Sequence, residues 1–400
     1  LHLSIRRQRQ MCIRDSAKYV DDIAVPENTL EILLGQSKFA HAKILSMDLS
    51  QVENFPGVIK VLTSADIPGT NDCSPFAGDD PIFAENVVSY LGQSVFAVVA
   101  EDIKTARNAI ELADIKYEEL PAVITIDQAL ETGNVLGPPA VIECGKVDQA
   151  LAKSKNKLEG KIILGGQEHF YLEGQVAFAI PKEDTDLLVY SSTQHPSETQ
   201  QIIAKMLNQK SNTITVVVRR IGGGFGGKET NFLTSSICAL LANKTKKPIK
   251  LRLDRDDDII ITGKRHDFYS EYEVGFNKLG VIEGLKIKLA SRCGMSPDLS
   301  HAINERALLH IDNAYYLSNI EVQNYLCKTN TATSTAFRGF GGNQGMMAIE
   351  NIIDNIARYL KKDPFEIRKK NFYQKNKKNI TPVSYTHLRA HETRHDLVCR

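Results

Sequence analysis

The stretch Ile221-Gly-Gly-Gly-Phe-Gly-Gly-Lys-Glu229 decides how this 400-residue sequence is interpreted. It follows Thr213–Arg219, whose β-branched residues predict a strand, and it precedes Asn231–Ala242, whose pattern predicts a helix. Glycines let the backbone approach another object closely, and the start of a helix presents free N–H groups. The stretch therefore predicts a bend that binds an anionic ligand, with a plain strand-to-helix turn as the alternative.

Two nucleotide-binding patterns fit this bend only formally. Gly222–Lys228 follows a P-loop, but Glu229 stands where a P-loop needs the Ser or Thr hydroxyl that binds magnesium. The range also fits G-x-G-x-x-G, yet Ala239–Asn243 lacks the acidic residue expected about 20 positions after the glycines of a dinucleotide site. A nucleotide-binding or purely structural module is thus kept as an alternative, and we expect it to bind no ATP.

A second glycine-rich bend, Ala336-Phe-Arg-Gly-Phe-Gly-Gly-Asn-Gln-Gly345, also leads into a helical pattern, Met346–Leu360. It again sets phenylalanine among glycines, and we expect its Arg338 to be buried. Two such bends in one core indicate a large, planar, anionic ligand held by backbone amides.

Composition excludes several classes of protein. The net charge is +1, and no basic stripe is interleaved with aromatic residues, so we expect no nucleic-acid partner. No apolar run approaches the roughly 20 residues that cross a bilayer, so we expect no membrane span. The seven cysteines form no C-x-x-C pair, which favours reduced thiols in a cytoplasmic protein and disfavours a zinc or iron–sulfur site in this chain.

The alternation of predicted elements favours an α+β fold in two parts. The predicted domains are 17–130, a linker at 131–144 with its glycines and prolines, and 145–382. Residues 1–16 and 383–400 differ in composition and resemble translated adaptor sequence, so we set them aside as artefact-like extensions. The predicted strands are Ser94–Ala100, Ile115–Tyr117, Leu187–Ser192, Thr213–Arg219, Pro248–Leu253 and Tyr269–Gly275. The predicted helices follow Asp102, span Glu198–Leu207, Asn231–Ala242 and Met346–Leu360, and run from Pro364 to Phe372.

Five motifs resemble the molybdenum-binding portion of the xanthine oxidase and aldehyde oxidase family, and above all its xanthine dehydrogenases. They are Gly166–Glu173, Ser192–Gln194, Gly222–Glu229, Asn304–Ala307 and Thr335–Gly342. They occur in the family's order, and the resemblance runs from about Ala17 to Tyr373. It implies an α/β hammerhead domain followed by the first half of the molybdopterin-binding domain, and hence a molybdenum–molybdopterin cofactor.

The resemblance also implies which residues approach the cofactor. Gln194 matches a glutamine near the molybdenum's oxo ligand, and Gly224 and Phe225 lie in the loop that approaches the metal's oxygen ligands. Arg338 matches an arginine beside the pterin. Gln194 could instead simply end a strand, and His169 is more readily a structural hydrogen-bonding histidine than a ligand.

For the substrate, the resemblance implies a purine. The implied purine is hypoxanthine or xanthine, and the product of its oxidation is urate. The resemblance further implies that a metal-bound hydroxide attacks a carbon of the ring, from which hydride is transferred to the cofactor. Glu229 and Arg306 match the pair that hydrogen-bonds the purine, and Phe340 matches a ring that stacks on it. A guanidinium can neutralise charge developing on a ring oxygen. The alternatives are that Arg306 is a helix-surface residue and that Phe340 only fills the core. The alternative enzyme is an aldehyde-oxidising relative.

The family's general base is a glutamate near its C-terminus, which we expect to lie beyond this chain, so we expect the isolated chain to be inactive. The family passes electrons to Fe–S clusters and FAD, which we expect on a partner subunit or on further sequence. A homo-oligomer of heteromers is the expected assembly.

Overall fold

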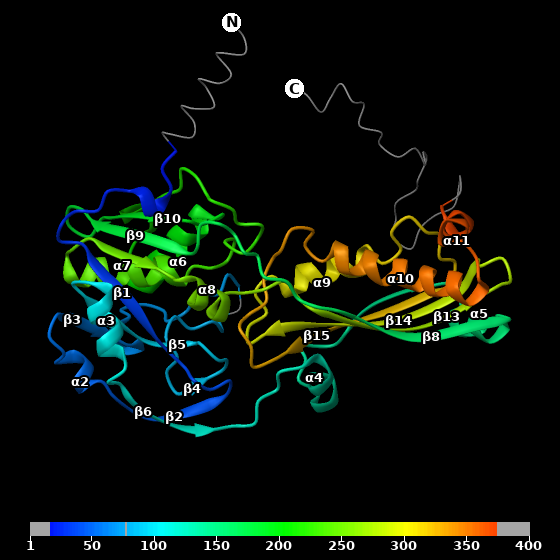
Figure 1. The fold of residues 1–400 in the computed structure, drawn as a ribbon, viewed down its shortest axis with the longest axis horizontal. Coiled ribbons are helices and arrows are strands. Elements are labelled where there is room, and N and C mark those ends of the chain that lie inside the picture. Colours follow the sequence, from blue (N-terminus) through cyan, green and yellow to red (C-terminus); the bar gives the residue numbers. More distant parts are fainter. Residues whose placement is uncertain (1–16, 77, 374–400) are drawn as a thin grey trace, which may run out of the picture.

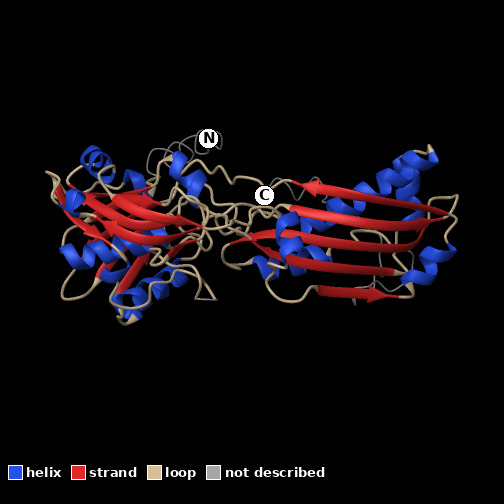
Figure 2. Cartoon of the chain, turned by 90° about the horizontal axis from the view of Figure 1, so that it is seen from below, coloured by secondary structure: helices blue, strands red, loops and turns tan. Residues whose placement is uncertain are grey.

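The computed structural model describes residues 17–76 and 78–373. The predicted extensions at 1–16 and 383–400 lie outside them. The described residues form two lobes, the first around a seven-stranded and a three-stranded sheet and the second around a five-stranded sheet (Figure 1). Seen from below, the long strands of the second lobe run side by side along its length (Figure 2). This mixture confirms the α+β class.

The large sheet of the first lobe joins strands from both predicted domains. Its order is β11-β10-β9-β12-β1-β5-β3, and β1 pairs with β12 in parallel, with Leu30 opposite Ile249. The sheet therefore crosses the predicted linker, and the boundaries 17–130 and 145–382 stay predictions. The strands are β1 (Leu30–Gln36), β3 (Val58–Leu62), β5 (Ser94–Ala100), β9 (Val176–Pro181), β10 (Leu187–Ser191), β11 (Ile214–Val217) and β12 (Ile249–Arg252).

The first lobe is held by a core on each side of β5, all of whose seven residues are buried. One core contains the buried faces of α6 and α7, and the other is closed by α3 and the sheet β4-β2-β6. The Asp102 side chain accepts from Thr105 N at 2.9 Å and caps α3, as predicted. The remaining elements are η1 (Val20–Asp22), β2 (Ala42–Asp48), α2 (Ser50–Glu53), η2 (Ser64–Asp66), β4 (Val87–Val88), α3 (Ile103–Ile110), β6 (Asp114–Glu119), α6 (Pro196–Leu207), η3 (Ser211–Thr213), α7 (Leu233–Thr245) and α8 (Arg255–Ile261).

The second lobe is a five-stranded sheet in the order β7-β15-β14-β13-β8. Helices α9 and α10 lie over one face of this sheet and α4 lies against the other (Figure 1). Its elements are α4 (Ile126–Thr132), β7 (Ala140–Cys144), α5 (Val147–Lys153), β8 (Asn156–Leu164), β13 (Phe268–Phe276), β14 (Ile282–Gly294), α9 (Ser300–Leu309), β15 (Ile320–Lys328), α10 (Gly342–Leu360) and α11 (Pro364–Asn371).

The segment 131–144 is not an irregular connector. It begins inside α4 and ends with β7, which pairs antiparallel with β15 so that Ile142 lies opposite Val322. Alternate residues of β7 are half-buried against the core of the second lobe. The alternation of half-buried and exposed residues along β7 is short, and the glycines and prolines before it led to the prediction of a linker.

The other predicted strands and helices are confirmed with ends that shift by a few residues. The largest shift is in α10, which begins at Gly342 instead of Met346, because Gly342 and Gly345 belong to its first turns. Within residues 17–76 and 78–373, no helix combines the length and apolar character needed to cross a bilayer.

Candidate functional site

The first glycine-rich bend, residues 222–229 (glycine loop 1), connects β11 to α7. Phe225, at its tip, has a φ of 54° and is 46% exposed. Beside it, Gln194 Oε1 accepts from Gly226 N at 2.9 Å and from Lys228 N at 3.3 Å. A Cβ on Gly224 would lie 2.5 Å from Gln194 Oε1, so only glycine leaves room for this side chain.

Glycine loop 1 retains free hydrogen-bond donors. In the described part of the chain, no acceptor meets the N–H groups of Gly223, Gly224 and Phe225, although Gly222, Gly226 and Lys228 all donate. Because Gln194 uses its oxygen on the loop, its Nε2 is left without an acceptor among the same residues. Donors of this kind suit a ligand that carries oxygen or negative charge.

The second bend, residues 336–345 (glycine loop 2), meets glycine loop 1 directly. Arg338 N donates to Phe225 O at 2.8 Å. A Cβ on Gly226 would lie 2.5 Å from Ala336 O, so the two backbones are in close contact. The expectation that both bends serve one site is therefore supported by their geometry. The Arg338 side chain is exposed, so the expectation of a buried Arg338 is wrong; its backbone is held, with Arg265 Nη2 donating to its carbonyl at 3.1 Å.

A buried polar network lies beneath glycine loop 1. Lys228 Nζ donates to Glu173 Oε2 at 3.2 Å, and these side chains are 0% and 9% exposed. The same Oε2 accepts from Gly222 N at 2.8 Å, while Gln175 Nε2 donates to Gly227 O at 3.0 Å. Burial lowers the pKa of Lys228, and Glu173 opposes that shift. Lys228 is thus directed into the protein, away from the position of a P-loop lysine, which disfavours the nucleotide-binding alternative.

His169 joins glycine loop 2 to the core as a structural histidine, as expected. Its Nε2 lies 2.7 Å from Ala336 O, and its ring stacks on Phe337 with centroids 4.5 Å apart. Arg265 lies on the Phe337 ring at 3.9 Å from the centroid. Burial lowers the pKa of His169, which favours the neutral ring at neutral pH.

The predicted substrate residues lie on or near these loops, with Phe340 in glycine loop 2, Glu229 at the end of glycine loop 1 and Arg306 on α9. Glu229 is partly buried, and burial raises its pKa, with Glu198 adding to the shift and His195 opposing it. Arg306 is exposed on α9, and its Nε would lie 3.7 Å from a Cβ on Gly342. Phe340 is half-buried with a φ of 49°. Among the described residues no hydrogen bond or ion pair joins Glu229 to Arg306, which leaves both free for a ligand.

The sequence singled out the loops but not the groups that hold them in place. No pattern in the sequence assigns a role to Glu173, Gln175 or Arg265. None marks Asp298 either. Thr230 Oγ1 donates to Asp298 Oδ2 at 3.1 Å and lies 2.9 Å from Thr335 Oγ1. Lys228 was the one signal in the sequence for this buried network. A charged residue between a glycine turn and an apolar helix needs a partner when it is buried.

Comparison with known proteins assigns both parts of the chain. Residues 130–372 match the family described as the molybdopterin cofactor-binding domain, and residues 15–121 match the aldehyde oxidase and xanthine dehydrogenase a/b hammerhead domain. These matches confirm the expected order of the two domains.

Individual relatives extend this likeness. The chain is 43% identical over 375 residues to a xanthine dehydrogenase/oxidase of Gallus gallus and 44% identical over 360 residues to one of Mus musculus. The two alignments include 93% and 90% of this chain but only 27% of each relative. The chain therefore spans about a quarter of the length of these relatives. The aldehyde oxidoreductase of Desulfovibrio gigas matches with a TM-score of 0.84 and 27% identity, over 92% of this chain and 43% of that one.

Proposed function

Because the chain belongs to the family that contains the molybdopterin-binding domains of xanthine dehydrogenase and aldehyde oxidase, we propose that it forms the purine-oxidising site of a molybdenum hydroxylase. The observation that carries this proposal is the contact between the two glycine loops at Arg338 N and Phe225 O, beside the free N–H groups of loop 1.

The residues of the loops fit an oxygen-bearing cofactor. The N–H groups of Gly224 and Phe225 and the Nε2 of Gln194 are donors without acceptors in the described chain. The backbone of Arg338 contacts Phe225, and its exposed guanidinium adds a positive charge to glycine loop 2. We assign these four residues to cofactor binding. When bound, the molybdenum–molybdopterin group supplies the redox centre at which substrate is oxidised.

Three further residues are assigned to the purine. Burial raises the pKa of Glu229, which favours the protonated carboxyl that can donate to a ring nitrogen. Arg306 is always charged and can stabilise negative charge on a ring oxygen. Phe340 adds an aromatic face, worth about 0.5–1.5 kcal/mol in a stacked pair.

Electron transfer to Fe–S clusters and FAD, carried by a partner subunit or by further sequence, is part of the same proposal, as are a cytoplasmic location and a homo-oligomer of heteromers. Four of the five described cysteines are buried, so they are poorly placed to hold a cluster at the surface.

The second candidate function is aldehyde oxidation, favoured by the likeness to the aldehyde oxidoreductase of Desulfovibrio gigas. The two functions differ at Glu229 and Arg306, which suit a purine ring with several polar edges better than a single aldehyde group. The test is the double variant Glu229→Leu, Arg306→Met in the whole protein that contains this chain, with Glu305→Gln on the exposed side of α9 as the control.

We expect purine oxidation in the double variant to fall by about 10²–10³ through loss of the charged donors, while molybdenum content and aldehyde oxidation are retained. The control should oxidise purine at the original rate. An unchanged purine rate in the double variant would refute the assignment of these two residues.

A further inference from the structure

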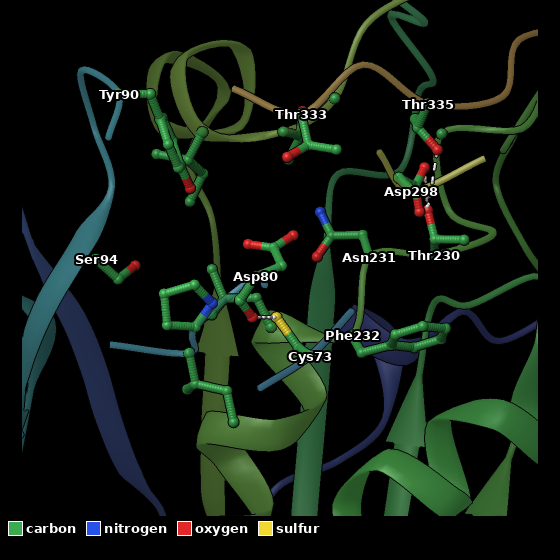
Figure 3. A pocket seen from close by; sticks show the side chains of 17 residues that line it. Cys73, Asp80, Tyr90, Ser94, Thr230, Asn231, Phe232, Asp298, Thr333 and Thr335 are labelled. Carbon is green, nitrogen blue, oxygen red and sulfur yellow. Dashed lines mark hydrogen bonds between the residues drawn. The ribbon is translucent and has the colours of Figure 1, made fainter. Parts of the chain in front are cut away.

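A small cavity lies behind glycine loop 1, with a volume of about 60 Å³ (Figure 3). Its wall combines residues from four separate regions: the segment 73–94, residues 227–233 from the end of glycine loop 1 to the start of α7, residues 261–263 at the end of α8, and residues 298 and 333–335, which precede α9 and glycine loop 2. The space is large enough for one ion with a water molecule or two.

The cavity is acidic and has no cationic side chain in its wall. Asp80 and Asp298 are its charged residues. Burial raises the pKa of Asp80 to about 7, and the nearby Asp298 adds to that shift; burial raises the pKa of Asp298 to about 6. Asp298 accepts from Thr230, whereas no hydrogen bond or ion pair to the Asp80 carboxylate is found in the described part of the chain.

Neutral oxygen atoms without partners line the same space. Ser94 is 2% exposed, and its Oγ has no hydrogen-bond partner among the described residues. The Oγ1 of Thr333 is likewise buried and unpaired. Asn231 adds a side-chain amide, and Figure 3 shows it in the wall together with Asp80 and Thr333. Unpaired buried polar atoms are costly, so the hydroxyl groups of Ser94 and Thr333 call for a partner in this space.

We propose that this cavity binds one hard cation of the calcium class between Asp80 and Asp298. Its oxygen atoms come from carboxylate, hydroxyl and amide groups, which suit calcium or potassium, whereas zinc prefers nitrogen and sulfur. Cys73 also lines the cavity, but burial raises its pKa well above the ordinary value and keeps the thiol protonated. The cation would join the segment 73–94 to the ends of both glycine loops.

The first test is calorimetric titration of the full chain, stripped with a chelator, with Ca²⁺, Mg²⁺ and K⁺ in turn. Asp80→Asn and Asp298→Asn keep the shape of each side chain and remove its charge. Asp184→Asn is the matched control, because Asp184 is exposed in the turn between β9 and β10 and has a φ of 50°, which asparagine tolerates.

We expect Ca²⁺ or K⁺ to bind with a stoichiometry of one, and each cavity variant to lower the affinity by about tenfold or more, since the affinity follows the number of charged ligands. The control should bind like the original chain. Absence of saturable binding, or equal binding by the cavity variants, would overturn the proposal.

Tyr90 provides a second readout that does not depend on the acidic variants folding. It lines the cavity, and the chain has no tryptophan, so bound Tb³⁺ is sensitised by tyrosine alone. Tyr90→Phe should reduce Tb³⁺ luminescence without changing its displacement by Ca²⁺. Tyr359→Phe, at a 51% exposed site on α10, should leave both unchanged. Luminescence that Tyr90→Phe does not reduce would place the ion elsewhere and contradict the proposal.

Discussion

The two glycine loops have similar sequences but use their glycines differently. In glycine loop 1, glycine makes room for Gln194 and leaves the N–H groups of Gly223 and Gly224 without acceptors in the described chain. In glycine loop 2, the N–H groups of Phe340 and Gly342 donate within the loop. Its glycines instead permit the close approach of helix α9. One loop leaves backbone donors without acceptors in the described chain, and the other packs its backbone against a helix.

The two loops also differ in what holds them. Glycine loop 1 rests on the buried pair of Lys228 and Glu173, whereas the second half of glycine loop 2, beyond the contacts of His169 and Arg265, packs closely on the backbone of α9. A Cβ on Gly341 would lie 1.9 Å from Ile303 O, and one on Gly345 would lie 2.1 Å from Ala307 O. Substitutions in the two loops should therefore fail for different physical reasons, which the following predictions separate.

The largest effect should come from Lys228→Met. It leaves the Glu173 carboxylate buried without its cation, which costs about 3–5 kcal/mol of unfolding free energy. The double variant Lys228→Met, Glu173→Gln should recover a large part of that loss, because no unpaired charge remains. Urea unfolding measures both, and Lys43→Met in an exposed ion pair, whose side chains are each 51% exposed, is the control. Equal losses in the single and double variants would show that the pair does not act as a unit.

Gly341→Ala should follow, with a loss of about 2–3 kcal/mol from overpacking and from its φ of 90°. The matched control is Gly165→Ala, because a Cβ there meets no atom within 4 Å. Both are compared by urea unfolding. If the two substitutions cost the same, the close approach of α9 to glycine loop 2 is not what requires glycine.

A smaller effect is expected on the stability of the fold at acidic pH. Burial lowers the pKa of His266 to about 3, below its ordinary value of 6.5, so the unfolded chain binds more protons than the folded chain below pH 6.5. Stability should therefore fall as the pH drops from 6.5 toward 3, by at most about 1.4 kcal/mol per pH unit from this group. His266→Asn should remove this component between pH 6.5 and 5.5 in urea unfolding. An identical pH dependence in the variant would exclude His266 as its source.

The sequence predicted the elements whose signals are local. The apolar run 94–100, the cap at Asp102 and the Asp363-Pro364 start of α11 all depend on neighbouring residues, and all are found. The start of α10 was missed because Gly345 is a poor helix former by propensity, and only the distant Ala307 carbonyl explains its presence.

The candidate site divides in the same way. The glycine loops were found by composition, and the resemblance to a family then suggested roles for Glu229 and Arg306. Asp80 and Asp298 could not be found, because they lie far apart in the sequence and only the fold brings both to one cavity. The exposure of Arg338 was also misjudged, since glycines on either side say nothing about which way a long side chain points.

The central claim is that the free donors of glycine loop 1 bind an oxygen-bearing cofactor. The most direct measurement is a crystal structure of the whole protein with molybdopterin and molybdenum bound. We predict that the N–H groups of Gly224 and Phe225 and the Nε2 of Gln194 lie within about 3.2 Å of oxygen atoms of the bound group. A bound group that leaves these three donors facing water or other protein atoms would contradict the account.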